Sequence, residues 1–332
     1  MKFSLFVDNL ILYISCTALS GAGAWFIQRI GGKVGLLDIA NERSSHAGFI
    51  PKGGGIGVLA AFSVCSIILS VPKGFWIPAV LLSLFSLWGD YSEIRPKTRL
   101  LYQFAAGVIL LVAVSWQKGG GLWGYTLVPP LAIFVVGTAN FYNFMDGING
   151  IAGITGVVGF GLLSWFAADL DANSWIITLS ICMSLACLGF LPLNMPKAKV
   201  FAGDVGSILL GFIFAGIVVW LSKSFLDFVC AAACLFTFYA DELTTIIVRL
   251  KDGDKLTRPH RKHLYQLLAN ELGIAHWKVS LGYGFGQLLV GLSVLFFINS
   301  GLLFILSLIF FYFFLFSVLT AAIRMWLTSK SV

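Results

Sequence analysis

Residues 204–222 read DVGSILLGFIFAGIVVWLS, a single aspartate followed by a long run without any charged side chain. A run of this length is typical of a helix that crosses a bilayer, whose hydrocarbon core of about 30 Å needs roughly 20 apolar residues. The apolar residues do not alternate with polar ones, so a strand of a membrane-spanning barrel is excluded. The stretch therefore predicts one membrane-spanning helix that begins close to Asp204.

Comparable runs recur along the whole chain. Of its 332 residues, 58% are hydrophobic and 11% are charged, whereas a soluble domain carries about 25% charged residues. A water-soluble fold cannot bury so much apolar surface, so we predict an all-α, polytopic integral membrane protein with a single transmembrane domain over residues 1–332. We expect eleven spans, or ten because two are short, at residues 5–27, 55–71, 75–89, 100–116, 126–142, 150–167, 174–194, 207–222, 225–242, 279–298 and 301–323.

The first span has too long an apolar stretch for a cleaved signal peptide. Orientation follows from the cations. Of the 22 Lys and Arg residues, only Lys2, Lys73, Lys118 and Lys223 fall on one side of this topology, and the cation-rich side is the cytoplasmic one. This predicts a periplasmic N-terminus, a cytoplasmic C-terminus and cytoplasmic loops near residues 28–54, 90–99, 143–149, 195–206 and 243–278. The net charge of +7 is then a topological signal, and no nucleic-acid partner is predicted.

The polar chemistry is confined to these cytoplasmic loops. All four histidines and most acidic residues fall there, and no ionisable residue lies at the middle of a span. Proton-coupled transporters usually carry such residues near the midplane, so a transporter is disfavoured. The six cysteines lie inside spans without zinc-type spacing, and we interpret them as small apolar residues. A site at the boundary of membrane and cytoplasm is the remaining interpretation.

Two of the polar segments combine glycines or an aspartate with cations. Pro51-Lys52-Gly53-Gly54-Gly55 follows the segment 37–46, and its glycines allow the backbone to approach a ligand closely. A flexible lead-in to a helix is the alternative. Asp90 stands where the third span meets the cytoplasm, shortly before Arg95, Lys97 and Arg99. A solvated helix end would show the same pattern.

A third segment repeats a polar residue every three positions, at Asn140, Asn143, Asp146 and Asn149. This step predicts four side chains near one face of a helix. They are embedded in apolar sequence, where an unpaired amide or carboxylate is costly. We therefore expect that face to meet a polar ligand or an ion, although the spacing does not match a calcium-binding loop.

The last two segments carry cations beside an aspartate or an aromatic ring. Asp204 opens a span and is preceded by Lys197, Lys199 and Phe201. The segment from Arg258 to Gln266 concentrates cationic side chains that suit a pyrophosphate; a basic loop that touches anionic lipid is the alternative. Isolated aspartates for Mg²⁺, cations for phosphates and an aromatic ring for a base together indicate phosphoryl transfer.

From about Leu37 to Gln266 the chain resembles the polyprenyl-phosphate N-acetylhexosamine-1-phosphate transferases, the MraY/WecA-like glycosyltransferase family 4. Residues 38–55 are similar to the first cytoplasmic signature of that family, and residues 140–150 to its Asn-x-x-Asn-x-x-Asp-Gly-x-Asp-Gly motif. Residues 201–204 are similar to its Phe-x-Gly-Asp motif, and residues 260–266 to its histidine-rich loop. The order His-Arg-x-His-x-Tyr-Gln is closest to the WbpL-like O-antigen branch.

This resemblance implies a catalytic domain that transfers a UDP-activated N-acetyl-hexosamine 1-phosphate, of the FucNAc, QuiNAc or GlcNAc type, to undecaprenyl phosphate. UMP would leave, and lipid-linked polysaccharide or O-antigen synthesis would start at the cytoplasmic face of a bacterial inner membrane. The alternatives are a GlcNAc-1-phosphate transferase of the WecA type, a lipid or sugar-phosphate transporter, and a noncatalytic scaffold. Membrane lipid is an expected partner, and the oligomeric state stays open, with a homodimer allowed.

The resemblance also implies roles for individual residues. Asp204 is the expected Mg²⁺ ligand, with Mn²⁺ as a substitute, Asp146 is a second candidate ligand, and Phe201 is expected to stack on uracil. The expected catalytic residues are Asp90, Asp146, Asp204, His260 and His263. The expected substrate-binding residues are Arg43, Ser45, His46, Lys52, Asn140, Asn143, Asn149, Lys199, Phe201, Arg258 and Arg261.

Three positions depart from the family pattern. Gly89 stands where the family usually carries the first of two adjacent aspartates, Asn149 replaces the second aspartate of the longer motif, and Ala40 replaces a proline. The missing carboxylate at position 89 puts a general-base role for an aspartate pair in doubt. A lipid phosphomonoester has a second pKa near 6, so at neutral pH it is largely dianionic and attacks without a strong base.

Overall fold

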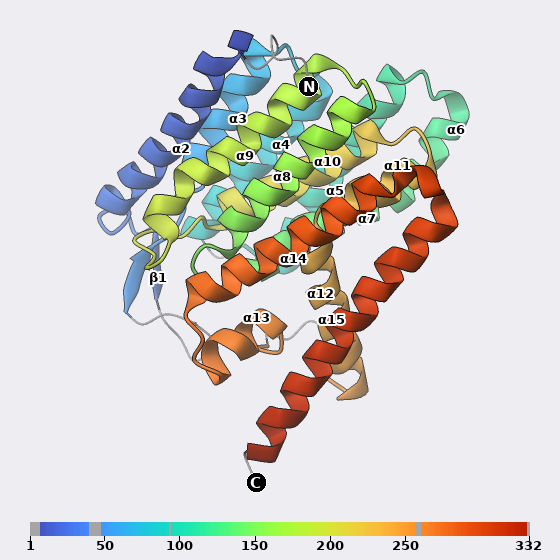
Figure 1. Cartoon of the computed structure of the whole chain (residues 1–332). Helices are drawn as coiled ribbons and strands as arrows, with labels where there is room; N and C mark the ends of the chain where they lie inside the picture. The colour runs from blue at the N-terminus through green and yellow to red at the C-terminus, as the bar shows by residue number, and fades with distance from the viewer. Residues whose placement is uncertain (1–6, 40–47, 93, 256–259, 331–332) are drawn as a thin grey trace.

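The computed structural model describes residues 7–39, 48–92, 94–255 and 260–330 and is a bundle of long helices (Figure 1). The helices of the first half are α2 (Leu10–Ile30), α3 (Ile56–Ile68), α4 (Lys73–Tyr91), α5 (Pro96–Gln117), α6 (Gly121–Thr126), α7 (Val128–Met145) and α8 (Ile151–Asp169). Those of the second half are α9 (Ser174–Asn194), α10 (Asp204–Leu221), α11 (Phe225–Ala233), α12 (Phe236–Lys251), α13 (Leu264–Gln266), α14 (His276–Phe296) and α15 (Leu302–Lys330). Single turns follow α13 at Leu267–Glu271 and α14 at Ile298–Ser300.

The all-α, polytopic membrane architecture is confirmed. Each predicted span overlaps at least one helix. Within the described residues, eight helices are long and apolar enough to cross a membrane, and a bent helix pair would make a ninth. The helices α3 and α4 fall outside that set. The predicted count of eleven and the predicted sides of the two termini therefore stay predictions.

The predicted span over residues 225–242 is wrong as a single helix. It is divided into α11 and α12, whose axes differ by 89°. A capping box from Ser224 and Asp227 begins α11. Leu235, with φ −122° and ψ 27°, then leaves the helical conformation before α12 starts. Hydropathy alone does not register this break because both sides of it are apolar.

A second departure from the prediction is a two-stranded antiparallel sheet in the loop between α2 and α3. The strands β1 (Leu37–Ile39) and β2 (Phe49–Pro51) pair with Leu37 opposite Pro51 and Asp38 opposite Ile50. Strands of three residues are too short to show alternating hydrophobicity, so the sequence pattern gave no sign of them. The hairpin brings Lys52 to the end of the bundle where the other polar segments lie.

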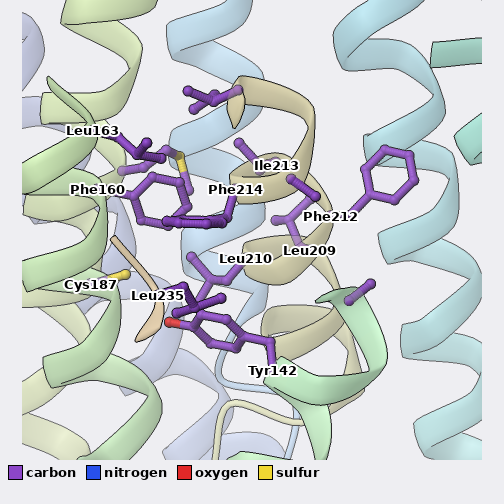
Figure 2. Packing of buried hydrophobic residues seen from close by; sticks show 14 of the residues in the cluster. Tyr142, Phe160, Leu163, Cys187, Leu209, Leu210, Phe212, Ile213, Phe214 and Leu235 are labelled. Atoms are coloured by element: carbon purple, nitrogen blue, oxygen red, sulfur yellow. The ribbon is translucent and has the colours of Figure 1, made fainter. Parts of the chain in front are cut away.

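The core of the bundle is built around α10. Of its most apolar window, 89% is buried, against 6% for α15. α10 packs on α7, α4 and α8, and Figure 2 shows its side chains Leu210 and Phe214 facing Tyr142 and Phe160. Because every side of α10 is covered, the residue that begins it, Asp204, is fixed in position relative to the neighbouring helices.

Several helices meet at glycines. A side chain at Gly57 of α3 would overlap the backbone of Ser20 in α2, and one at Gly189 of α9 would overlap the backbone of Thr17. A side chain at Gly55, just before α3, would overlap the backbone of Gly206 in α10. Small residues allow helix backbones to approach closely in membranes, where apolar side chains gain little from contact with one another instead of lipid. We call these contacts the glycine seam.

Candidate active site

The five polar segments meet at one end of the bundle, around β1 and α13 in Figure 1. The backbone N–H of Gly54 donates to the Phe201 carbonyl at 2.8 Å, and the Lys52 ammonium lies 3.9 Å from the Asp90 carboxylate. Asn143 binds Asp204, and the Tyr265 hydroxyl donates to the Phe144 carbonyl. The predicted convergence of these segments on one site is thus supported by direct contacts.

Asp204 is held by polar neighbours from two other helices at this end. The Asn143 side-chain amide donates to Asp204 Oδ1 and to Ser207 Oγ, both at 2.8 Å. The Arg99 guanidinium contacts the other carboxylate oxygen. As the first residue of α10, Asp204 also lies at the positive end of the helix dipole, a position that suits an acidic side chain.

Asp90 lies beside this group, on the last turn of α4. Its Oδ2 accepts a hydrogen bond from the backbone N–H of Val205 at 3.3 Å. Gly203, with φ +72°, passes so close that a side chain there would fall 2.7 Å from the same oxygen. Asp90 therefore faces the start of α10 and Lys52, and it is 9% exposed.

Asp146 is different because its carboxyl group has no hydrogen bond or ion pair among the described residues. It caps the C-terminus of α7. Burial, together with the nearby Asp90 carboxylate, raises the pKa of Asp146 to about 8. A carboxyl group in this setting lacks a positive partner, and a hard divalent cation would supply one.

The acidic groups do not form a closed metal cage. Within the described part of the chain, the only trio of His, Cys, Asp or Glu donors that all lie within 4.8 Å of one another is Cys16, Cys65 and Cys182. These thiols are buried inside the bundle, as expected for small apolar residues. Mg²⁺ is usually held by one or two carboxylates, several waters and substrate phosphates. The arrangement of Asp204 and Asp146 fits such an open site.

We expected the glycine run to let the backbone approach a ligand, but two of its glycines contact another backbone segment instead. The N–H groups of Gly54 and Gly55 donate to the carbonyls of Phe201 and Ala202 at 2.8 and 2.9 Å. A side chain at Gly54 would fall 2.8 Å from Val200. The close approach is therefore between two backbone segments, and it sets Lys52 beside the start of α10.

The prediction that four polar residues share one helix face is correct for two of them. α7 ends at Met145, so only Asn140 and Asn143 are helical. Asn140 exchanges hydrogen bonds with Gln103 of α5, at 2.7 and 3.3 Å, which makes it a link between helices in this structure. Asn149 lies in the turn before α8, where its side-chain amide donates to the Pro196 carbonyl at 3.2 Å.

The remaining predicted residues lie around this centre. Lys199 is exposed, Phe201 is half-buried, and His260 and Arg261 are half-buried in the loop before α13. Burial and the neighbouring His263 lower the pKa of His260 to about 4, so it is neutral at physiological pH. Four predicted residues lie outside the described part of the chain: Arg43, Ser45, His46 and Arg258.

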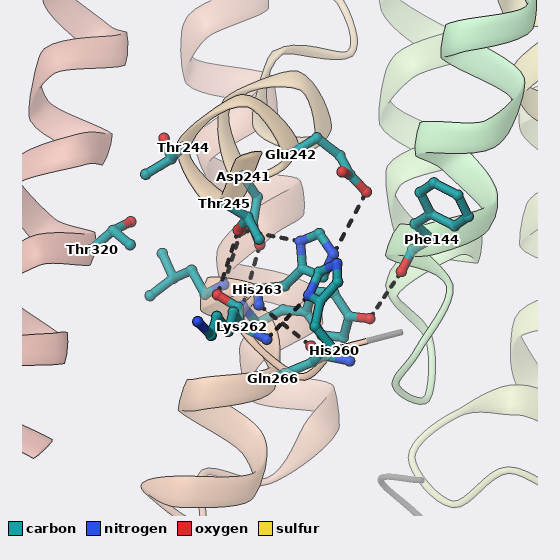
Figure 3. Close-up of polar contacts among 12 residues, drawn as sticks. Phe144, Asp241, Glu242, Thr244, Thr245, His260, Lys262, His263, Gln266 and Thr320 are labelled. Atoms are coloured by element: carbon teal, nitrogen blue, oxygen red, sulfur yellow. Dashed lines mark hydrogen bonds and ion pairs between the residues drawn. The ribbon is translucent and has the colours of Figure 1, made fainter. Parts of the chain in front are cut away.

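His263 does not face the polar centre but is buried against α12 (Figure 3). Its Nδ1 lies 3.5 Å from Asp241 and its Nε2 3.7 Å from Glu242. Burial opposes the charged form, but the negative charges of Asp241 and Glu242 raise the pKa of His263 above its ordinary value. The pKa values of the two histidines of this loop are therefore shifted in opposite directions.

Four polar residues of this region were not in the predicted set. Arg99 contacts Asp204, and Gln103 pairs with Asn140. The Asn194 side chain accepts from the Gly150 N–H at 2.7 Å and donates to the Val200 carbonyl at 3.0 Å. Asp241 binds the histidine-rich loop. Each lies in or beside an apolar run. A polar residue in such a run is costly to bury unpaired, and this could have marked all four as candidates for the site.

A family model described as glycosyl transferase family 4 matches residues 73–222, the region that carries Asp90, Asp146 and Asp204. Over this region the chain is similar to that family. The WbpL-like branch stays a prediction.

The curated relatives match most of the length of the chain. It is 26% identical to the undecaprenyl-phosphate alpha-N-acetylglucosaminyl 1-phosphate transferase of Escherichia coli strain K12, over 74% of this chain and 72% of that protein. It is 23% identical to a probable undecaprenyl-phosphate N-acetylglucosaminyl 1-phosphate transferase of Bacillus subtilis, over 75% and 74%. It is 25% identical to the decaprenyl-phosphate N-acetylglucosaminephosphotransferase of Mycobacterium tuberculosis, over 77% and 74%.

Proposed function

We propose that the chain transfers an N-acetyl-hexosamine 1-phosphate from a UDP-sugar to undecaprenyl phosphate and releases UMP. The observation that carries this proposal is the convergence of Asp90, Asp146 and Asp204 with Lys52 and Arg99 at one end of a membrane bundle. Carboxylates for a divalent cation and cations for phosphates, held on rigid helices, suit phosphoryl transfer, where positioning and charge neutralisation dominate catalysis. The names of the relatives, which specify a polyprenyl phosphate and an N-acetylglucosamine phosphate, support the substrate classes.

In the proposed reaction, an oxygen of the lipid phosphate attacks the β-phosphorus of the UDP-sugar. A new P–O bond forms, the bond between that phosphorus and the bridging oxygen breaks, and UMP leaves with the electron pair. Lys52 and Arg99 would bind phosphate oxygens, and Asp90 would orient the lipid phosphate through its contact with Lys52. One phosphoanhydride replaces another, so the reaction is expected to be readily reversible.

Asp204 and Asp146 would hold Mg²⁺, or Mn²⁺ in its place. When bound, the ion would neutralise charge on the donor phosphates. The protein's own part is to hold both carboxylates: Asn143 orients Asp204 by a hydrogen bond at 2.8 Å, and Asp146 is fixed at the C-terminus of α7. Phe201 would stack on the uracil. Arg261 and the neutral imidazole of His260 would contact phosphate or sugar.

The lipid tail has a suitable place in an apolar groove of about 370 Å³ between α11, α12 and α15. Phe228, Ala232 and Phe236 line it on one side, and Leu306 and Phe310 on the other. The groove reaches Ala240, the residue beside Asp241, so it extends toward the polar end. A polyprenyl chain in this groove would bring its phosphate to the membrane boundary. The distribution of Lys and Arg supports the cytoplasmic face of a bacterial inner membrane for that boundary.

The sugar is the part of the proposal with two candidates. The relatives' names favour GlcNAc. The motif order from His260 to Gln266 favours FucNAc or QuiNAc and a role in O-antigen synthesis. A transporter is not favoured by any contact described above.

The test is to incubate the purified protein with undecaprenyl phosphate, Mg²⁺ and a panel of UDP-N-acetyl-hexosamines, and to measure UMP release. Lipid-dependent release is expected, and the best donor identifies the sugar. Omission of the lipid and addition of EDTA are the controls. Folded protein that releases no UMP from any donor of a wide panel would contradict the proposal.

A further inference from the structure

A buried acidic pair lies on α12, behind the histidine-rich loop. Asp241 is 0% exposed and Glu242 is 3% exposed. Burying a carboxylate is costly unless it is paired and hydrogen-bonded. Neither residue was among those that the sequence analysis assigned to the site, and the proposed reaction does not use them.

Asp241 accepts four hydrogen bonds, two of them from the backbone of the loop. The backbone N–H groups of Leu264 and Tyr265 donate at 2.9 and 3.3 Å, and the hydroxyls of Tyr283 and Thr245 donate at 2.6 and 3.1 Å. One carboxylate thus joins α12, α13 and α14. An amide in its place would have a single acceptor oxygen and could not satisfy the same donors.

His263 lies between the two acids, as Figure 3 shows. Its ring nitrogens face Asp241 on one side and Glu242 on the other, and Glu242 Oε1 has no hydrogen-bond partner in the described residues. Three other charged or titratable groups face it: Arg324 of α15, which opposes its charge, His260, whose ring centroid is 4.8 Å away, and Tyr265, whose ring stacks on it at 5.5 Å. The loop is therefore held from α12 by backbone and by side chain.

Tyr265 carries this connection to the proposed site. Its hydroxyl donates to the Phe144 carbonyl at 3.0 Å. Gly147 packs on the same ring, since a side chain there would overlap it. Phe144 and Gly147 stand on either side of Asp146, so the Tyr265 ring contacts the turn that positions this carboxyl group.

We propose that Asp241 is a positioning residue, which fixes the loop from His260 to Gln266 and, through Tyr265, the turn that carries Asp146. This inference rests on the proposed function. Asp241 would act through its hydrogen bonds to the loop and need not touch a substrate.

The test compares Asp241→Asn, Tyr265→Phe and the double variant in the UMP-release assay. Loss of a residue that orients a metal ligand typically costs about 10–100-fold, so each single variant should lower kcat by about that factor with the KM of the donor little changed. If both act through the same contact, the double variant should be no slower than Asp241→Asn. Independent sites would instead give losses that multiply.

Two further readouts separate positioning from general damage to the fold. Hydrogen exchange of the amides of Leu264 and Tyr265 should be faster in Asp241→Asn and unchanged in Tyr265→Phe. The decline of kcat at high pH should begin at a lower pH in Asp241→Asn, because His263 loses its closest negative partner. Glu242→Gln is the matched control: it should move the pH profile in the same direction but leave the amide exchange unchanged, since Glu242 does not bind the loop backbone.

Multiplying losses, or unchanged amide exchange in Asp241→Asn, would overturn the inference. If Asp241→Asn does not fold, Tyr283→Phe, which removes one donor to Asp241, takes its place, and losses that multiply with those of Tyr265→Phe would again overturn it. A wild-type protein without UMP release contradicts the proposed function instead, and the exchange measurement still decides whether Asp241 holds the loop.

Discussion

Asp204 is held between an amide and a guanidinium. Asn143 binds one carboxylate oxygen at 2.8 Å, and Arg99 contacts the other. The first neighbour orients the carboxylate, and the second balances its charge. A carboxylate prepared in this way can exchange a protein cation for a metal without moving far, which suits a site where positioning dominates catalysis.

Asp204→Asn should lower kcat by at least about 100-fold, because removal of one group that stabilises charge in a preorganised site typically costs about 10²–10³. The Mg²⁺ concentration for half-maximal rate should also rise. UMP release against Mg²⁺ concentration measures both. Asp169→Asn, which changes an exposed carboxylate at the other end of α8, is the control and should keep the wild-type curve. Full turnover of Asp204→Asn in Mg²⁺ would remove the central assignment.

Gly89 shows that a missing aspartate need not disable the site. A Cβ added to Gly89 would meet the Ile94 side chain at 3.5 Å, an ordinary contact, whereas Asp90 faces Val205 and Lys52. The side chain of an aspartate at position 89 would thus point toward Ile94, in the loop after α4. We expect Gly89→Asp to fold and to change kcat less than Asp90→Asn does, measured side by side. An inactive Gly89→Asp beside an active Asp90→Asn would contradict this reading.

At the residue scale, the sequence was informative where chemistry is local. A lone aspartate at the start of an apolar run predicted the position of Asp204 at a helix N-terminus. The partners of these residues were not predictable, because Arg99 and Gln103 reach the site through the packing of α5 on α4 and α7. Packing of this kind joins residues that are distant in sequence.

At the scale of elements, the pair of Asn140 and Gln103 links α7 to α5. Gln103 is 4% exposed, so Asn140→Ala would leave a buried amide unpaired, at a cost of about 1–3 kcal/mol. We expect a lower unfolding temperature in detergent with an unchanged KM for the UDP-sugar. The double variant Asn140→Leu with Gln103→Leu should recover much of the stability, since replacing both partners is often nearly neutral. A raised KM for the UDP-sugar in Asn140→Ala would instead support the sequence-based expectation that Asn140 contacts the substrate.

The loop before α13 should make stability depend on pH. The pKa of His263 is raised, so its ion pairs contribute fully below its unfolded pKa of about 6.5, and this contribution is lost as the pH rises through the raised value. The unfolding temperature should therefore fall as pH increases above neutrality, and His263→Gln should reduce that slope. His260→Gln is the matched control, because His260, with a pKa of about 4, is neutral throughout this range. An equal slope in wild type and His263→Gln would contradict the assignment.

The helices themselves were predictable because hydropathy reports which residues must avoid water. The break between α11 and α12 was not, since Cys234 and Leu235 are as apolar as their neighbours. The same break explains why Asp241 was overlooked: it looked like the polar end of a span, yet it lies within α12 as the buried partner of another loop.

At the scale of the whole molecule, the bundle separates an apolar groove from a polar end and lets α12 connect them. Filling the groove should weaken binding of the lipid alone. Ala232→Phe is expected to raise the KM for undecaprenyl phosphate and to leave the KM for the UDP-sugar unchanged, because Ala232 lines the groove between α11 and α15. The effect should vanish with a short-chain prenyl phosphate. Val108→Phe, on the exposed side of α5, is the control; an equal rise in that variant would exclude the groove as the tail site.

The glycine seam has a consequence for how the sequence can drift. At Gly55, Gly57 and Gly189, every other amino acid adds atoms where a neighbouring backbone already lies. Glycine is the smallest residue, so any substitution at these positions requires a neighbouring helix to shift. During evolution we expect the exposed side chains of α15 to vary freely and the glycines of the seam to be retained.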